Sequence, residues 1–266
     1  HRRRQRDILM YIDTHCHLDD EKLKNDLENV VNGFLAAGVE RVIDIGCDEA
    51  SSLLVKEQAE KFPCVYFAAG FHPMDIERYD AKAEETIIGL LKHEKCVAVG
   101  ETGLDYYWKK DNKEEQKEIF ARQIEIAYEN KLPINVHVRD ATGDALEILK
   151  QNKSKLSYGG VMHCFSGSRE IAAEMLKLGM YISFGGTLTF KNARSASEVA
   201  AFVPDDMILT ETDSPYLAPE PVRGTVNTPK NIPHIVKKLA ELRKTDENKI
   251  AENVMRNAKT LFYKLK

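Results

Sequence analysis

Short apolar segments alternate along this chain with longer segments of helical periodicity. Each apolar or β-branched run that precedes an amphipathic segment predicts a strand and then a helix, and repetition of that unit predicts a parallel sheet. Eight runs of this kind occur. The predicted strands are Met10–Thr14, Arg41–Gly46, Cys64–Gly70, Cys96–Glu101, Pro133–Val138, Gly160–His163, Tyr181–Phe184 and Met207–Thr212.

The segment between the first two predicted strands shows the helical period most clearly. Apolar residues recur at three- and four-residue steps from Leu23 to Ala37, and Gly38 is placed to end the helix in a left-handed conformation. The same reasoning predicts seven further helices. They are Glu49–Lys61, Lys82–His93, Lys113–Asn130, Thr142–Gln151, Ser168–Leu178, Pro229–Arg243 and Asp246–Leu265.

Eight strand–helix units favour a closed barrel. The chain has 266 residues, and a (β/α)8 TIM barrel typically needs about 250. No Gly/Ser-rich linker divides it, so residues 10–266 are predicted to form a single TIM-barrel domain of the α/β class. A doubly wound open sheet is the alternative, but its Gly-rich phosphate-binding turn is missing after the first strand.

Residues 1–9 are set apart by their composition. The sequence HRRRQRDIL precedes Met10 and is rich in arginine, so we interpret it as a tag remnant or a disordered segment. A basic arm that binds nucleic acid is the alternative interpretation. Elsewhere no apolar run approaches the roughly 18 residues that a membrane helix needs, which argues against a membrane role.

The five cysteines form no CxxC pair, and no signal peptide precedes them. Reduced thiols fit this pattern best, so we expect a cytoplasmic protein. The formal net charge of −4 argues against broad binding to duplex DNA, because neutralisation of phosphates supplies most of that affinity.

Candidate metal ligands follow the predicted strands, at the ends where barrel enzymes place their active sites. His15 and His17 follow the first strand, and their spacing of two residues directs both imidazoles to one face of an extended backbone. Glu101 ends the fourth strand. The other candidates are His137, His163 and Asp213, at or after the fifth, sixth and eighth strands.

Six ligands are too many for one catalytic metal ion, which usually keeps about three protein ligands and a water molecule. We therefore expect two divalent ions about 3.5–4 Å apart. Glu101 would bridge them, because a carboxylate offers two oxygens and a neutral imidazole only one nitrogen. The expected ligands are His15, His17 and Asp213 for one ion and His137 and His163 for the other.

Such an arrangement predicts hydrolysis by a metal-activated water. The two ions would lower the pKa of the water between them and stabilise the attacking and leaving oxygens of a displacement. Asp213 is the best-placed group to orient that water or to accept its proton. The predicted catalytic residues are Asp213 and Glu101.

Seven short phrases of the chain match one known family in order and spacing. They are Asp13–Leu18 (DTHCHL), Gly70–Pro73 (GFHP), Gly100–Tyr106 (GETGLDY), Pro133–Arg139 (PINVHVR), His163–Gly167 (HCFSG), Glu211–Leu217 (ETDSPYL) and Arg223–Pro229 (RGTVNTP). Together they resemble the TatD family of metal-dependent deoxyribonucleases, within the amidohydrolase-like barrel superfamily. The resemblance covers almost the whole chain, and it implies a TIM barrel, divalent metal and phosphodiester hydrolysis with 3′ exonuclease character.

Five further residues are candidate substrate contacts. His72 resembles a family position that lies near the metals without being a primary ligand, and either a phosphate contact or a loop-capping role fits it. Asp105 is placed to orient His72 or a metal ligand. Arg139 can hold a phosphate oxygen or form a structural salt bridge. Arg223 and Asn227 lie in the loop after the eighth strand, a usual place for phosphate contacts in barrels, or in an ordinary surface loop.

Nucleic acid is the expected partner, and single-stranded DNA in particular. Tyr106–Trp108 are followed by Lys109 and Lys110, a combination on which single-stranded bases stack, although packing of a long loop also explains it. The sequence indicates no obligate protein partner. His and carboxylate ligands suit Zn, Mn, Fe or Ni, and the family that the chain resembles is usually assayed with Mg or Mn, so the metal stays open.

Two other functions were weighed. One is an amidohydrolase or deacylase that acts on a small molecule or an aminoacyl-tRNA; many such barrels bridge their metals with a modified lysine on the fourth strand, where this chain has Glu101. The other is a noncatalytic nucleic-acid-binding module with a structural metal. Structural sites are usually closed by Cys and His ligands, whereas a mixed set of His and carboxylate ligands at a barrel mouth is the opposite pattern.

Overall fold

Eight parallel strands form one nearly closed barrel. This computed structural model describes residues 9–266. The strands lie in the order β1 to β8, and each is parallel to the next. The expected (β/α)8 fold is confirmed. The strands are β1 Tyr11–Cys16, β2 Val39–Ile45, β3 Val65–Ala69, β4 Cys96–Asp105, β5 Ile134–Arg139, β6 Gly160–Met162, β7 Met180–Phe184 and β8 Ile208–Thr210.

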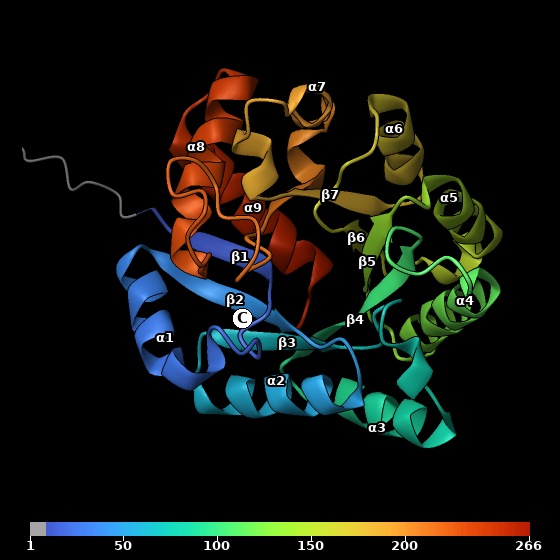
Figure 1. The fold of residues 1–266 in the computed structure, drawn as a ribbon. Helices are drawn as coiled ribbons and strands as arrows, with labels where there is room; N and C mark the ends of the chain where they lie inside the picture. The colour runs from blue at the N-terminus through green and yellow to red at the C-terminus, as the bar shows by residue number, and fades with distance from the viewer. Residues whose placement is uncertain (1–8) are drawn as a thin grey trace, which may run out of the picture.

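Helices surround this barrel on its outer side (Figure 1). All eight predicted helices are present within residues 9–266, together with α7, which the sequence analysis missed. The helices are α1 Leu27–Ala36, α2 Glu49–Lys61, α3 Ala81–Leu91, α4 Lys113–Glu129, α5 Thr142–Gln151, α6 Arg169–Lys177, α7 Arg194–Phe202, α8 Ile232–Arg243 and α9 Glu247–Leu261.

Capping residues mark the ends of several helices. Asp48 caps α2 by accepting a hydrogen bond from the backbone N–H of Ser51 at 2.8 Å, and Ser168 caps α6 in the same way through Ile171. Gly38 follows α1 with φ +88, the left-handed conformation predicted for it. These local interactions set the start of α2 and α6 and the end of α1.

Most neighbouring strands are joined by backbone ladders, but β8 and β1 are joined mainly by other groups. The Thr14 hydroxyl donates to the carbonyl of Thr210 at 2.9 Å. Beyond the last residue of β8, the N–H of Asp213 donates to the carbonyl of His15 at 2.8 Å. The barrel is therefore closed partly by two residues that the sequence analysis named as metal ligands.

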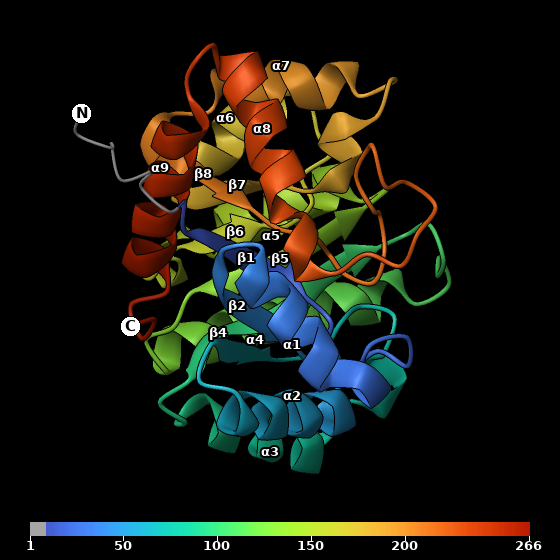
Figure 2. The same ribbon diagram turned by 90° about the vertical axis from the view of Figure 1, so that its left-hand side faces the viewer.

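The two ends of the barrel differ. In Figure 2 the C-terminal end of the chain lies on the left-hand side, whereas the orange loop after β8 and the blue segment after β1 lie on the right. The predicted segment 1–9 overlaps the described residues only at Leu9, which is partly buried against the core; residues 1–8 lie outside the described part. Among residues 9–266, no helix combines the length and apolar character that a membrane crossing requires.

Candidate metal centre

A cavity of about 300 Å³ opens at the carboxyl ends of the strands. We call it the acidic cavity, because its wall includes five carboxylate side chains and no lysine or arginine. All but one of the six predicted metal ligands line it, and His15 lies just beneath its floor with none of its surface exposed. The lining residues are His17, Asp19, Asp20, Cys47, His72, Met74, Asp75, Glu101, His137, His163, Asp213 and Tyr216.

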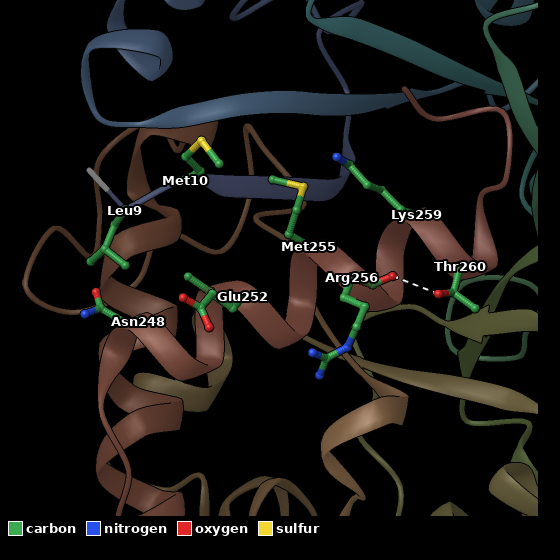
Figure 3. A pocket seen from close by; sticks show the side chains of 9 residues that line it. Leu9, Met10, Asn248, Glu252, Met255, Arg256, Lys259 and Thr260 are labelled. Atoms are coloured by element: carbon green, nitrogen blue, oxygen red, sulfur yellow. Dashed lines mark hydrogen bonds between the residues drawn. The ribbon is translucent and has the colours of Figure 1, made fainter. Parts of the chain in front are cut away.

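A larger cavity, of about 700 Å³, lies elsewhere, between α9 and the residues that precede β1 (Figure 3). Met10 and Met255 lie close to its upper edge in that view, and Glu252 is the only carboxylate of its wall. It contains no histidine or cysteine. A single carboxylate is a poor ligand set for a catalytic metal ion, so the acidic cavity is the candidate metal centre.

Four ligand atoms meet at one end of the acidic cavity. His15 Nε2 and His17 Nε2 are 3.2 Å apart, and each lies 3.3–3.4 Å from Glu101 Oε2 and from Asp213 Oδ1. His15 Nε2, His17 Nε2 and Glu101 Oε2 form a triangle with sides of 3.2–3.4 Å, so one ion can lie about 2.0 Å from all three atoms, the usual distance from zinc to a histidine nitrogen or a carboxylate oxygen. The spacing of these three atoms fits one metal ion.

The other oxygen of Glu101 faces a second group of nitrogens. Glu101 Oε1 lies 2.9 Å from His163 Nε2 and 3.1 Å from His137 Nδ1, and these two nitrogens are 3.2 Å apart. Three atoms at such distances can contact one common ion and leave room for further ligands. One buried carboxylate thus divides four histidines into two pairs.

The remaining ring nitrogens of the first pair each face an oxygen. His15 Nδ1 lies 3.1 Å from Asn135 Oδ1, and His17 Nδ1 lies 3.0 Å from the carbonyl of Ile45. An oxygen at that position holds the proton on Nδ1, so Nε2 presents its lone pair to the cluster. Metal-binding histidines are usually oriented in this manner.

The second pair is oriented by carboxylates. His137 Nε2 lies 2.9 Å from Asp105 Oδ2, which directs the lone pair of Nδ1 to Glu101. His163 Nδ1 lies 3.4 Å from Glu211 Oε2, a longer contact, but neither atom has a hydrogen-bond partner among the described residues. Glu211 is fully buried, and its other oxygen accepts a hydrogen bond from the N–H of Cys164.

His72 is oriented in the opposite sense. Its Nδ1 accepts a hydrogen bond from the N–H of Met74 at 3.0 Å, so a neutral His72 carries its proton on Nε2. That N–H points into the cavity, 3.5 Å from Glu101 Oε1. Burial lowers the pKa of His72 to about 3, so the ring stays neutral. In this tautomer His72 can donate a hydrogen bond there, and its Nε2 offers no lone pair to a metal, although the ring lies within reach of Glu101 and His137.

The negative charge of the buried carboxylates is stabilised by a positive charge placed beside them. Burial lowers the pKa of His163, but Glu101 and Glu211 outweigh it and hold the pKa well above 6.5. Without a metal ion, protons on the histidines would have to supply that charge. A divalent cation supplies positive charge and leaves the imidazoles neutral, so the donor set fits a metal ion.

Gly103 allows β4 to reach this site. It has φ +139, and a side chain there would collide with the carbonyl of His137 on β5. This close approach extends β4 beyond its predicted end at Glu101 to Asp105 and places the Asp105 carboxylate against the His137 ring.

Two of the predicted substrate contacts do not face the cavity. Asp105 is 1% exposed, and its carboxylate is occupied by His137 and by the N–H groups of Tyr107 and Trp108. It orients a candidate ligand, which was one of the two roles considered for it. Asn227 is fully buried.

The side-chain amide of Asn227 forms hydrogen bonds to residues in and next to the loop that follows β8. Its amide donates to the carbonyls of Thr212 at 2.9 Å and Tyr216 at 2.7 Å, and its oxygen accepts from Asn231 at 2.9 Å. No group remains to hold a phosphate. The assignment of Asn227 as a substrate contact was wrong, because a polar residue in a loop is not necessarily exposed.

Arg139 and Arg223 reach the surface near the mouth, where each guanidinium lies on an aromatic ring. Arg139 is 3.9 Å from the centre of the Tyr107 ring and 5.6 Å from that of Trp108. Arg223 is 4.0 Å from the centre of the Phe190 ring. Neither forms an ion pair with a carboxylate in residues 9–266, so both charges are available to an anion.

Comparisons with known proteins agree with this geometry. The model of the family described as TatD related DNase matches residues 12–263. A protein of Bacillus subtilis named uncharacterized metal-dependent hydrolase YabD is 43% identical over 253 residues, which is 95% of this chain and 99% of that protein. The uncharacterized metal-dependent hydrolase YcfH of Escherichia coli is 37% identical, with 96% of each chain covered.

A solved structure supports the same relationship. The crystal structure of YjjV, a TatD homologue from Escherichia coli K12, superposes with a TM-score of 0.91 at 32% identity. The alignment covers 96% of this chain and 99% of that one, so the likeness extends over the whole barrel.

Proposed function

The chain belongs to the TatD related DNase family and is a metal-dependent hydrolase, and from this premise we propose that it hydrolyses phosphodiester bonds in DNA. The proposed substrate is single-stranded DNA, digested from its 3′ end. The observation that carries the proposal is the position of the Glu101 carboxylate. Its two oxygens face two separate pairs of histidines, which is the geometry expected of a bridging carboxylate.

Two divalent ions would occupy the centre. His15, His17 and Asp213 would hold one, His137 and His163 the other, and Glu101 would bind both. When bound, the ions supply a water of lowered pKa and polarise the phosphoryl group.

Asp213 is the proposed proton acceptor. Its Oδ1 lies with the nitrogens of His15 and His17, whereas no hydrogen bond from residues 9–266 occupies its Oδ2. The side chain is 16% exposed, so a water molecule can reach that oxygen. Asp213 would take the proton of the attacking water on Oδ2 while Oδ1 stays with the ligand cluster.

His72 is the proposed donor to the substrate. A neutral imidazole with its proton on Nε2 can donate a hydrogen bond to a phosphate oxygen as negative charge develops there. Arg139 and Arg223 lie farther from the centre and would hold neighbouring phosphates of the strand.

The decisive experiment is a nuclease assay on metal-reconstituted protein with single strands labelled at the 3′ or the 5′ end. Stepwise shortening from the 3′ end, abolished by chelation and restored by metal, is expected. Turnover confined to an amide and ester panel would overturn the proposal in favour of an amidohydrolase. Tight DNA binding without cleavage in any metal would favour a noncatalytic role.

The role of Asp213 has its own test. Asp213→Asn keeps one oxygen for the cluster but weakens the proton acceptor, so we expect activity to fall on the order of a hundredfold or more while much of the metal is retained. Equal losses of metal and activity would leave Asp213 as a ligand only.

A further inference from the structure

A second cavity, of about 500 Å³, adjoins the metal centre on the side of β5 and β6. We call it the aromatic cavity. It shares His137, His163 and Asp213 with the acidic cavity, so the two hollows meet at the candidate ligands. Any molecule that fills it has one end at the reacting centre.

The wall of the aromatic cavity is largely uncharged. Phe165, Phe190 and Leu217 supply apolar surface, and Asp213 is its only carboxylate. Asn192 also lines it, and both ends of its amide are without a hydrogen-bond partner in the part of the chain that the structure describes. Such a wall suits a flat, neutral group with a polar edge rather than an anion.

Two cations stand at the margin of this cavity. Arg139 is part of its wall, and Arg223 lies against the ring of Phe190. The wall thus combines candidate metal ligands, apolar side chains and a guanidinium. These groups suit, respectively, the phosphate under attack, a base and a neighbouring phosphate of a nucleic acid strand.

We propose that the aromatic cavity binds one unpaired nucleobase, from the nucleotide that carries the phosphate under attack. This inference rests on the proposed phosphodiesterase function and adds a specificity site to it. The ring of Phe190 stacks on the base, and the amide of Asn192 can pair with its edge as donor and acceptor together.

An unpaired base follows from the geometry of duplex DNA. A base in a duplex is stacked on both faces and paired along its edge, so it must leave the helix before it can enter a pocket. The energetic cost is smallest at a strand end or in a single strand. The cavity therefore gives a physical reason for selecting single-stranded DNA, independent of overall charge.

The test compares phosphodiesters with and without a base. Thymidine 5′-(p-nitrophenyl phosphate) and its 3′ isomer share their leaving group with bis(p-nitrophenyl) phosphate. We expect KM for one thymidine isomer to be roughly 5- to 150-fold below that of the bis-ester. Phe190→Ala should remove that advantage by raising KM for the thymidine ester towards that of the bis-ester.

Tyr128→Ala serves as the control, because Tyr128 is an exposed aromatic residue on α4 outside both cavities. This variant should change KM for none of the three esters. If Phe190→Ala slows all three esters equally, or leaves the preference for thymidine intact, the base pocket is refuted.

A binding measurement separates this inference from the proposed reaction. Calorimetric titration with thymidine 5′-phosphate and with deoxyribose 5-phosphate uses ligands that differ only by the base. Tighter binding of the nucleotide, lost in Phe190→Ala, supports the pocket even if no ester is hydrolysed. Equal affinity for the two ligands overturns it, whatever the activity.

Discussion

The acidic and aromatic cavities share three residues but differ in nearly everything else. Five carboxylates line the acidic cavity, whereas the aromatic cavity has Asp213 alone and adds Phe165, Phe190 and Arg139. Carboxylates without cationic side chains bind metal ions and repel DNA, while rings and amides bind bases and have no reaction to perform. In the two proposals made above, the barrel mouth would carry out the reaction in the acidic cavity and select the substrate in the aromatic cavity.

The largest expected effect lies in the acidic cavity. Glu101→Gln replaces one of the two oxygens that divide the histidines, so both proposed metal sites lose a ligand. We expect kcat/KM to fall on the order of 10³-fold or more for every phosphodiester, with bound metal reduced. Enzyme assays combined with elemental analysis measure both. A loss of kcat/KM restricted to nucleotide substrates would show that Glu101 acts in base selection, and the two cavities would then not differ in function.

His72→Ala should have the next largest effect. Removal of a hydrogen-bond donor to developing negative charge lowers kcat by roughly a hundredfold, with metal content unchanged. His93→Ala is a matched control, since His93 pairs with Glu60 outside both cavities. Loss of metal from His72→Ala would instead make His72 a ligand.

A smaller effect is expected beneath the acidic cavity. Asp105→Asn leaves the fold intact but weakens the group that orients His137, and such changes typically cost 10- to 100-fold in metal affinity or activity. Metal titration of the variant beside Asp206→Asn, a change at an exposed residue, gives the comparison. A rise in KM for DNA without a change in metal affinity would return Asp105 to the role of substrate contact.

The smallest effect concerns stability. Burial, with help from Asp48, raises the pKa of Asp75 above 3.8, so the folded state binds this proton more tightly than the unfolded state does. Above about pH 4 the deprotonated carboxylate therefore opposes folding.

Asp75→Asn should stabilise the metal-free protein at pH 7 by less than about 1 kcal/mol, and the gain should shrink as the pH falls to 4. Urea denaturation at the two pH values measures it, with the exposed Asp111→Asn as control. A destabilised variant at pH 7 would mean that the acidic cavity carries no such charge repulsion.

The six candidate ligands could be predicted because each lies at or just beyond the end of a predicted strand, and the alternation of strands and helices brings all strand ends together. Their orientation could not. Glu211 and Asn135 were missed because they act on a neighbouring imidazole across the barrel, although a glutamate within the apolar eighth run was a signal. Asn227 was misassigned for the converse reason, since burial of a loop depends on tertiary packing.

The helix α7 was missed on different grounds. Its sequence, RSASEVAAF, is short and rich in serine and alanine, so few apolar residues mark a period. Val199 and Ala200 are its buried residues, and packing against the barrel rather than local pattern stabilises it.

The junction between the last and first strands has a consequence for biosynthesis. Thr14 and Thr210, which meet there, are 196 residues apart, and the adjoining bond from Asp213 to His15 joins two ligands that would bind the same ion. A ribosome-bound chain that has not yet released β8 lacks that half of the centre. The growing polypeptide is therefore expected to complete this half of the proposed metal centre, and with it to gain hydrolytic activity, only after Asp213 has left the ribosome.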